Sequence, residues 1–284
     1  MGFRVFGIEI RWYGVIIALA ILIAFLIGNY ICRKQNFRDD VVYWVLLAVV
    51  PLGIILARLY YVVFDGSITE YFHFRNGGMA IYGGVIGGAI GLFIFCRIRK
   101  CGYFVVADIL VICGILAQSI GRWGNFFNTI GGYPEGHGFA VGHHVPPFTV
   151  MVNNVPHLAV FFFESILNLA GFVFLLWIFF KKQKKWGVTT ACYFLWYGVV
   201  RAILEPLRAD PLKIGKSDLV FNRISFLISL LLICLGGFLL FANKKGWLSQ
   251  KTATLLKPEP TEENDEATVE NKPRPRKTKE KEVT

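Results

Sequence analysis

A series of long apolar stretches constrains the fold of this chain more than any other feature. Seven of them are long enough, or nearly so, to cross a hydrocarbon layer about 30 Å thick. They cover about residues 14–31, 41–64, 79–96, 104–120, 158–180, 188–204 and 224–242. The first has no short apolar core followed by a cleavage site, so it is interpreted as an uncleaved anchor. The sequence predicts an all-α polytopic membrane protein with about seven transmembrane helices.

Composition supports a membrane protein and sets one tail apart. Charged residues make up 17% of the 284 residues, against about 25% in an average soluble domain. The net charge is +11, and the whole excess lies in residues 1–250, because residues 251–284 hold eight bases and eight acids. The bases lie between apolar stretches, which fits membrane topology rather than nucleic-acid binding. We expect an integral membrane domain over 1–250 and a disordered charged cytoplasmic tail over 251–284.

Lys and Arg are distributed unevenly among the connecting loops. The loops after the first, third, fifth and seventh stretches hold most of the bases, whereas 65–78 and 121–157 hold one arginine each. Loop 205–223, with four bases, departs mildly from this alternation. Because cytoplasmic loops carry the excess of Lys and Arg, we expect the N-terminus outside and the C-terminus in the cytoplasm.

Polar residues within the apolar stretches gather toward the predicted outer side. The members on the first five stretches are Tyr13, Arg58, Tyr82, Arg122 and Glu164. The sixth stretch adds residues at i, i+4, i+8 and i+11, on one helix face: Tyr197, Arg201, Glu205 and Arg208. Asp108 is the exception, at the inner start of the fourth stretch, and is interpreted as a helix-start or ion-pair residue. Ionisable groups inside a membrane usually face a cavity or a partner, so the set predicts an extracytoplasmic polar pocket.

Arginine outnumbers glutamate in this predicted pocket. Guanidinium groups bind phosphate through paired hydrogen bonds and stay charged when buried. The pocket therefore suits an anionic amphiphile such as a phospholipid head group. The alternative for Arg201 and Glu205 is a pair that only stabilises the helix bundle.

The segment after the fourth stretch reads Gly-Arg-Trp-Gly-Asn-Phe-Phe-Asn over residues 121–128. An interfacial turn would explain its aromatic residues, but not Arg122 together with Asn125 and Asn128, whose amides donate and accept hydrogen bonds. The following segment, 129–157, contains four histidines without a regular ligand spacing. We predict no metal site there, and expect a mobile loop that admits a substrate.

Five motifs together resemble those of the bacterial prolipoprotein diacylglyceryl transferase family. Residues 121–128 resemble its signature, 11–14 its opening motif, and 77–84 its glycine-rich entry to the third span. Phe163-Glu164-Ser165 with Asn168 resembles its motif in the fifth span, and the run 197–208 its motif in the sixth. Order and spacing match over about residues 8–245.

The resemblance implies a transferase of the bacterial cell membrane whose active site faces the extracytoplasmic side. Such an enzyme moves an sn-1,2-diacylglyceryl group from phosphatidylglycerol to the lipobox cysteine thiol of a prolipoprotein. It forms a thioether and releases glycerol phosphate, in the first step of lipoprotein maturation, and requires no cofactor. Neither nucleic acid nor any particular oligomeric state is implied. The alternatives are a divergent paralogue and a non-enzymatic carrier or binder of an anionic lipid.

The resemblance also distributes roles among the candidate residues. Arg122 and Arg201 would hold the phosphate, Glu164 or Tyr82 would handle the substrate proton, and Glu205 would hold Arg201. The remaining candidates would bind the substrate: Tyr13, Arg58, Asn125, Asn128, Tyr197 and Arg208.

Two positions depart from the family pattern. At the position of Tyr82 many members carry histidine. Tyrosine, with a reference pKa of about 10, is a poorer base than histidine at neutral pH. The family signature continues with a glutamate where this chain has Ile130, and Glu135 is the nearby candidate substitute.

Overall fold

The computed structural model describes residues 2–5, 8–38, 40–64, 80–130, 137–182, 185–209 and 224–248. Each of the seven predicted stretches forms a helix. These helices are α1 (Trp12–Lys34), α2 (Val41–Phe64), α3 (Ile81–Ile98), α4 (Tyr103–Gly121), α6 (Val160–Trp177), α7 (Val188–Leu204) and α8 (Ile224–Lys244). Within the described residues, six are long and apolar enough to cross a membrane, and α7, with 17 residues, is shorter. The helical membrane fold is confirmed, while seven spans and the orientation of the termini stay predictions.

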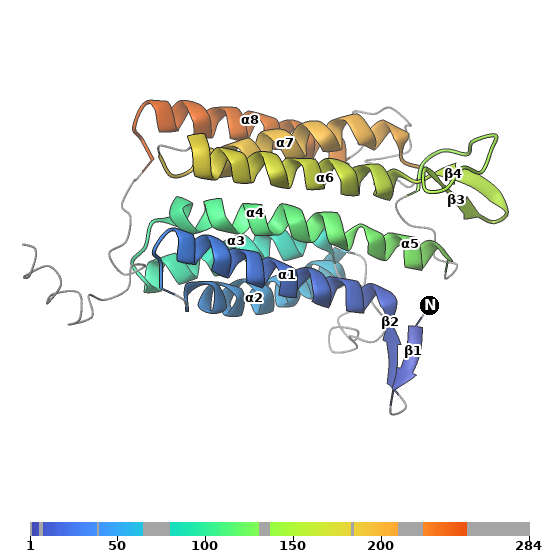
Figure 1. Ribbon diagram of the computed structural model, residues 1–284, viewed down its shortest axis with the longest axis horizontal. Helices are drawn as coiled ribbons and strands as arrows, with labels where there is room; N and C mark the ends of the chain where they lie inside the picture. The colour runs from blue at the N-terminus through green and yellow to red at the C-terminus, as the bar shows by residue number, and fades with distance from the viewer. Residues whose placement is uncertain are drawn as a thin grey trace, which may run out of the picture.

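The helices lie side by side in two layers, with α6, α7 and α8 in one and α1 to α4 in the other (Figure 1). Helix α2 packs along α3, and α7 packs along α8. Helix α4 contacts α1 in its own layer and α6 and α7 in the other. It lies in Tyr103–Phe127, the most buried of the six candidate spans. A residue at either end of α4 is therefore placed between the layers.

Apolar side chains cover the outside of the bundle. Val63, Ile81 and Ile98 are 65–75% exposed, whereas Asp108 and Glu164 are buried. A soluble protein shows the reverse distribution. The pattern fits a bundle surrounded by lipid, in which charged groups meet partners in the interior.

The glycines of α3 bring it against the backbone of α2. A Cβ atom at Gly83, Gly87 or Gly91 would lie only 2.3–2.6 Å from a carbonyl oxygen of α2. Small residues permit this close approach of helices in lipid, so these glycines let α3 pack directly on α2.

Asp108 joins α4 to the start of α7. Its carboxylate accepts hydrogen bonds from the backbone N–H groups of Gly187 (2.7 Å) and Thr190 (2.8 Å), and from the Thr190 hydroxyl (2.6 Å). The first amides of a helix lack partners within the helix, and an acidic group there is favourable. Asp108 is thus a helix-start residue, but it caps α7 rather than its own helix.

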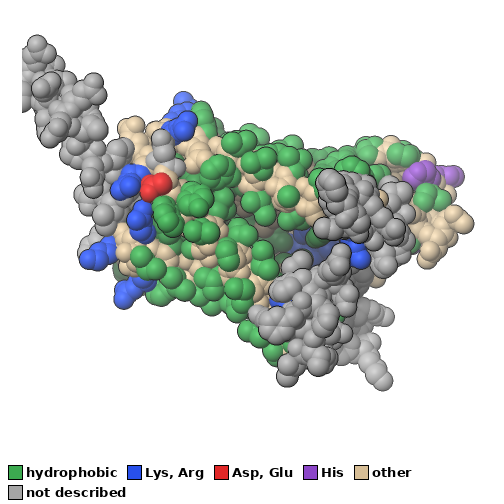
Figure 2. All heavy atoms as spheres, turned by 90° about the horizontal axis from the view of Figure 1, so that it is seen from below, with side chains coloured by type: hydrophobic (Ala, Val, Ile, Leu, Met, Phe, Trp, Pro, Cys, Tyr) green, Lys and Arg blue, Asp and Glu red, His purple; other side chains and the backbone are tan. Residues whose placement is uncertain are grey.

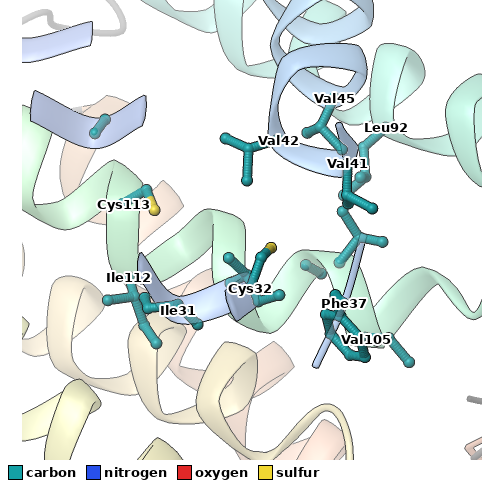
Figure 3. Close-up of a cluster of buried hydrophobic side chains, with 14 of the residues drawn as sticks. Ile31, Cys32, Phe37, Val41, Val42, Val45, Leu92, Val105, Ile112 and Cys113 are labelled. Atoms are coloured by element: carbon teal, nitrogen blue, oxygen red, sulfur yellow. The ribbon is translucent and has the colours of Figure 1, made fainter. Parts of the chain in front are cut away.

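An apolar core fills the space between α1, α2 and α4. Figure 3 shows Ile31, Cys32, Val42 and Cys113 from these helices facing one another. A cavity of about 250 Å³ adjoins this core, and its lining residues are all apolar or glycine. The charged candidate residues lie elsewhere.

Two β-hairpins depart from the all-helical prediction. Strand β1 (Gly2–Val5) pairs antiparallel with β2 (Ile8–Arg11), and β3 (Thr149–Val152) pairs with β4 (Val155–Leu158). Both hairpins lie at the end of the bundle where α5 (Trp123–Ile130) also lies (Figure 1). Residues 149–158, predicted to be part of a loop, thus form a regular hairpin, and the mobility of this segment stays a prediction. Two consecutive asparagines with positive φ, 48° and 64°, join β3 to β4, which is the turn geometry that closes a two-residue hairpin.

Some sequence predictions fall outside the described residues. They include the tail 251–284, Glu135, and the side chains of Asn128 and Ile130.

Candidate active site

Charged side chains from three helices meet at Glu164, which is 2% exposed near the start of α6. Arg122, directly after α4, places its Nε atom 2.9 Å from Glu164 Oε2. Arg201, in the last turn of α7, donates a hydrogen bond from Nη1 to Glu164 Oε1. Each carboxylate oxygen thus has its own guanidinium partner. The arrangement fixes the separation of the two arginines.

Two serines hold α4 against α6 beside this cluster. The Ser119 hydroxyl donates to the Ser165 carbonyl (2.8 Å), and the Ser165 hydroxyl donates to the Ser119 carbonyl (2.9 Å). Trp123 Nε1 donates to Ser165 Oγ at 3.1 Å. Ser119 and Trp123 flank Arg122 in the sequence, and Ser165 follows Glu164. These bonds therefore keep Arg122 in register with Glu164.

Part of the polar face predicted for α7 is present in the structure. Arg201 Nη2 lies 3.2 Å from Glu205 Oε2, one helical turn further along. Glu205 is fully buried. Arg208 comes after a short 3-10 turn that follows α7, and it interacts electrostatically with Glu164. Arg201 and Glu205 therefore lie on one face as predicted, whereas α7 ends at Leu204 and Arg208 lies beyond it in extended backbone. That the predicted residues serve one site stays a prediction.

Tyr82 reaches the cluster through a residue that the sequence did not mark. Tyr82, at the start of α3, has its Oη atom 3.4 Å from Ser225 Oγ, at the start of α8. Arg201 Nη2 donates to the same Ser225 Oγ at 3.5 Å. Serine is uncharged and fits readily into an apolar stretch, so neither hydropathy nor spacing singled out Ser225.

Tyr13 and the signature segment also meet. A Cβ atom on Gly124 would lie 2.6 Å from the Tyr13 ring, so the ring rests directly on the backbone of α5. Asn125 is half-buried, and its N–H donates to the Arg122 carbonyl at 3.2 Å. The backbone of Asn128 lies in the same short helix. Two motifs more than a hundred residues apart in sequence thus form one wall.

Aromatic contacts place the last two candidates, Arg58 and Tyr197. Arg58, on α2, is 1% exposed, and its Cζ atom lies 5.5 Å from the centre of the Tyr61 ring, within the range of a cation–π contact. Tyr197 stacks on Tyr193 with ring centres 5.8 Å apart. The part of either residue in substrate binding stays a prediction.

Among the described residues, the cluster holds more arginines than glutamates. Three arginines surround two glutamates: Arg122, Arg201 and Arg208 with Glu164 and Glu205. Charges interact strongly where water is excluded, and a buried excess charge is costly without a partner. Figure 2 shows Lys and Arg side chains set back in a hollow between apolar helices, toward the end that carries the histidines.

One histidine of the segment 129–157 lies in strand β4, and a second packs against it. His137 and His157 pack edge to face with ring centres 5.0 Å apart, and His157 Nδ1 donates to the Val155 carbonyl at 3.0 Å. Across the described part of the chain there is no group of three or more His, Cys, Asp or Glu side chains that could hold a metal ion.

Known proteins match this chain over a range that includes every residue of the cluster. Residues 1–242 match the family model of prolipoprotein diacylglyceryl transferase. The chain is 38% identical over 236 residues to a phosphatidylglycerol–prolipoprotein diacylglyceryl transferase of Ligilactobacillus salivarius, which covers 79% of this chain and 85% of the relative. The protein of that name from Clostridioides difficile is 36% identical, covering 76% and 85% of the two chains. The protein of the same name from Finegoldia magna is 31% identical, and the match covers 86% of this chain and 96% of the relative.

Proposed function

Because the chain belongs to the prolipoprotein diacylglyceryl transferase family, we infer that it transfers a diacylglyceryl group from phosphatidylglycerol to prolipoproteins. This reaction is the first step of lipoprotein maturation. One observation on this chain supports the inference: Glu164 lies buried between two guanidinium groups at one end of an apolar bundle. That arrangement suits a substrate with an anionic head group and apolar tails.

We propose that the acceptor is the lipobox cysteine of the prolipoprotein. Its thiolate attacks a glyceryl carbon, a carbon–sulfur bond forms, and the bond from that carbon to the phosphate oxygen breaks. The thiol proton is lost, and the phosphate group goes from one negative charge in phosphatidylglycerol to two in glycerol phosphate. Groups that bind the second charge more tightly than the first lower the barrier. Arg122 and Arg201 are placed to do this.

The other residues of the cluster would position these two arginines and the lipid. Glu164 and Glu205 already contact guanidinium groups, which supports a role in placing them. Tyr13, Asn125 and Asn128 would orient the glycerol head group. Three further residues would line the lipid site: Arg58, Tyr197 and Arg208. Handling of the substrate proton by Glu164 or Tyr82 stays a hypothesis.

We also propose that the site faces the extracytoplasmic side of the bacterial cell membrane. The cluster lies where α4 and α7 end and α3, α6 and α8 begin. The opposite helix ends carry basic residues, among them Arg33, Lys34, Arg97 and Lys244. Figure 2 shows Lys and Arg side chains at the end of the bundle away from the histidines. The positive-inside rule assigns that end to the cytoplasm.

The test is transfer by the purified full-length protein. The protein is incubated with phosphatidylglycerol vesicles and a lipobox peptide, and the peptide mass is followed. Wild type should add a diacylglyceryl mass to the cysteine. Arg122→Ala and Arg201→Ala should each lose roughly 100- to 1,000-fold of this rate, the cost of removing one donor to a developing anion. Arg99→Ala, at the opposite end of the bundle, is the matched control and should transfer like wild type.

A carrier or binder of anionic lipid is the competing function. It would use the same arginines without breaking a bond. Movement of lipid between leaflets of proteoliposomes without any peptide product would support the carrier and reject the transferase.

A further inference from the structure

Ser225 connects two residues of the cluster that come from different layers of the bundle. Its Oγ atom lies 3.4 Å from Tyr82 Oη on α3 and 3.5 Å from Arg201 Nη2 on α7. Ser225 itself lies in the first turn of α8 and is 7% exposed.

The chemistry of the groups fixes the direction of one of these two hydrogen bonds. A guanidinium only donates, so Arg201 must donate to Ser225 Oγ. In the contact between Ser225 and Tyr82 either hydroxyl can be the donor, and when Ser225 donates, Tyr82 Oη accepts. The phenolic proton of Tyr82 is then left to point away from Ser225. Bonds in such a chain polarise one another, and the charge on Arg201 makes Tyr82 the stronger donor.

We propose that Ser225 is a positioning residue that turns Tyr82 into a hydrogen-bond donor toward an oxygen of the lipid phosphate. The proposal rests on the transferase function inferred above and adds no step to the reaction. It gives Tyr82 a role for which a phenol is suited at neutral pH, donating rather than taking a proton. Because the donor faces an oxygen whose charge grows as the ester bond breaks, the effect falls mainly on kcat.

Helix α8 offers a matched control one turn away. The Ser229 hydroxyl donates to the Ser225 carbonyl of its own helix at 2.7 Å, and Ser229 is fully buried. Ser225→Ala and Ser229→Ala therefore remove the same atom from the same helix at similar burial. Only the first breaks the link between Arg201 and Tyr82.

The experiment measures kcat and the KM for phosphatidylglycerol by the peptide assay with the full chain. Ser225→Ala should lower kcat roughly three- to ten-fold, the effect of one neutral hydrogen bond, with KM little changed. Ser225→Thr, which keeps the hydroxyl, should restore most of the rate, and Ser229→Ala should match wild type. Equal kcat values for Ser225→Ala and Ser229→Ala would overturn the proposal, as would a Ser225→Thr rate as low as that of Ser225→Ala.

A double variant separates positioning from an independent effect. If Ser225 acts through Tyr82, adding Ser225→Ala to Tyr82→Phe should not lower kcat further, because the Tyr82 hydroxyl that Ser225 positions is already absent. Losses that multiply would refute action through Tyr82. Wild type that forms no product at all would reject the transferase function itself, and is thus distinct from a failure confined to the Ser225 variants.

Discussion

Replacing Glu164 by glutamine tests whether this carboxylate sets the distance between the two arginines. In wild type one carboxylate oxygen faces Arg122 and the other faces Arg201. Glutamine keeps one acceptor oxygen, but its amide nitrogen must face a guanidinium that can only donate. One of the two arginines must then move away.

The structure allows the size of this effect to be worked out. Losing a hydrogen bond to a charged group costs about 1.5–3 kcal/mol, and about 1.4 kcal/mol corresponds to a tenfold change in rate. Transfer by Glu164→Gln should therefore fall roughly 10- to 100-fold. Removing one partner of a buried ion pair also lowers the free energy of unfolding by about 3–5 kcal/mol, so Tm should fall as well.

The chain supplies a matched control in Asp40. This carboxylate also contacts two arginines, Arg38 at 3.2 Å and Arg99 at 3.4 Å, but with side chains 35–40% exposed. Asp40→Asn should lower the free energy of unfolding by less than about 1 kcal/mol and leave the transfer rate unchanged. The peptide assay, normalised to the folded fraction measured by tryptophan fluorescence, compares the two variants. Transfer by Glu164→Gln within twofold of wild type would refute the reasoning.

Three further predictions concern the fold and one thiol. Gly87→Ala puts a methyl group 2.4 Å from an α2 carbonyl oxygen and should lower the free energy of unfolding by about 1–3 kcal/mol. Gly88→Ala, with 3.5 Å of space, should keep the wild-type Tm, and equal Tm values would contradict the packing argument. Asp108→Ala leaves the first amides of α7 without their acceptor and should lower the free energy of unfolding by about 1–3 kcal/mol. A wild-type Tm would show that this cap is dispensable. The Cys96 thiol lowers the pKa of Cys101 through a hydrogen bond, so iodoacetamide should modify Cys101 at lower pH than an ordinary thiol. Cys96→Ala should shift that rate profile to higher pH, and an unmoved profile would exclude the hydrogen bond as the cause.

Hydropathy was sufficient to predict the helices, because a lipid-facing helix must be apolar over most of its length. The predicted stretches 41–64 and 188–204 coincide with α2 and α7. The β3–β4 hairpin was missed because its signal is local. It consists of Asn153 and Asn154 between two short apolar runs, and these were interpreted as part of a long loop.

The charged members of the site could be predicted because charge is expensive in lipid and therefore conspicuous in the sequence. Arg122, Glu164 and Arg201 stand out in this way, and the structure brings them into contact. Ser119 and Ser225 could not be predicted in this way, because they carry no charge. Hydroxyl groups cost little in an apolar stretch, and which of them meet depends on how each helix is rotated about its axis.

The polar contacts of α7 have a consequence for biosynthesis. Arg201, in the last turn of α7, opposes membrane insertion by less than the about 2.5–3.5 kcal/mol of an arginine at a helix centre, and α7 is the shortest of the seven helices. The carboxylates that it meets, Asp108 on α4 and Glu164 on α6, both come earlier in the chain. When α7 leaves the ribosome, those two helices have already been synthesised. If α7 is the seventh span, we expect its N-terminal amides and its guanidinium to find these partners as it enters the bilayer, so that the helices made before it guide its insertion.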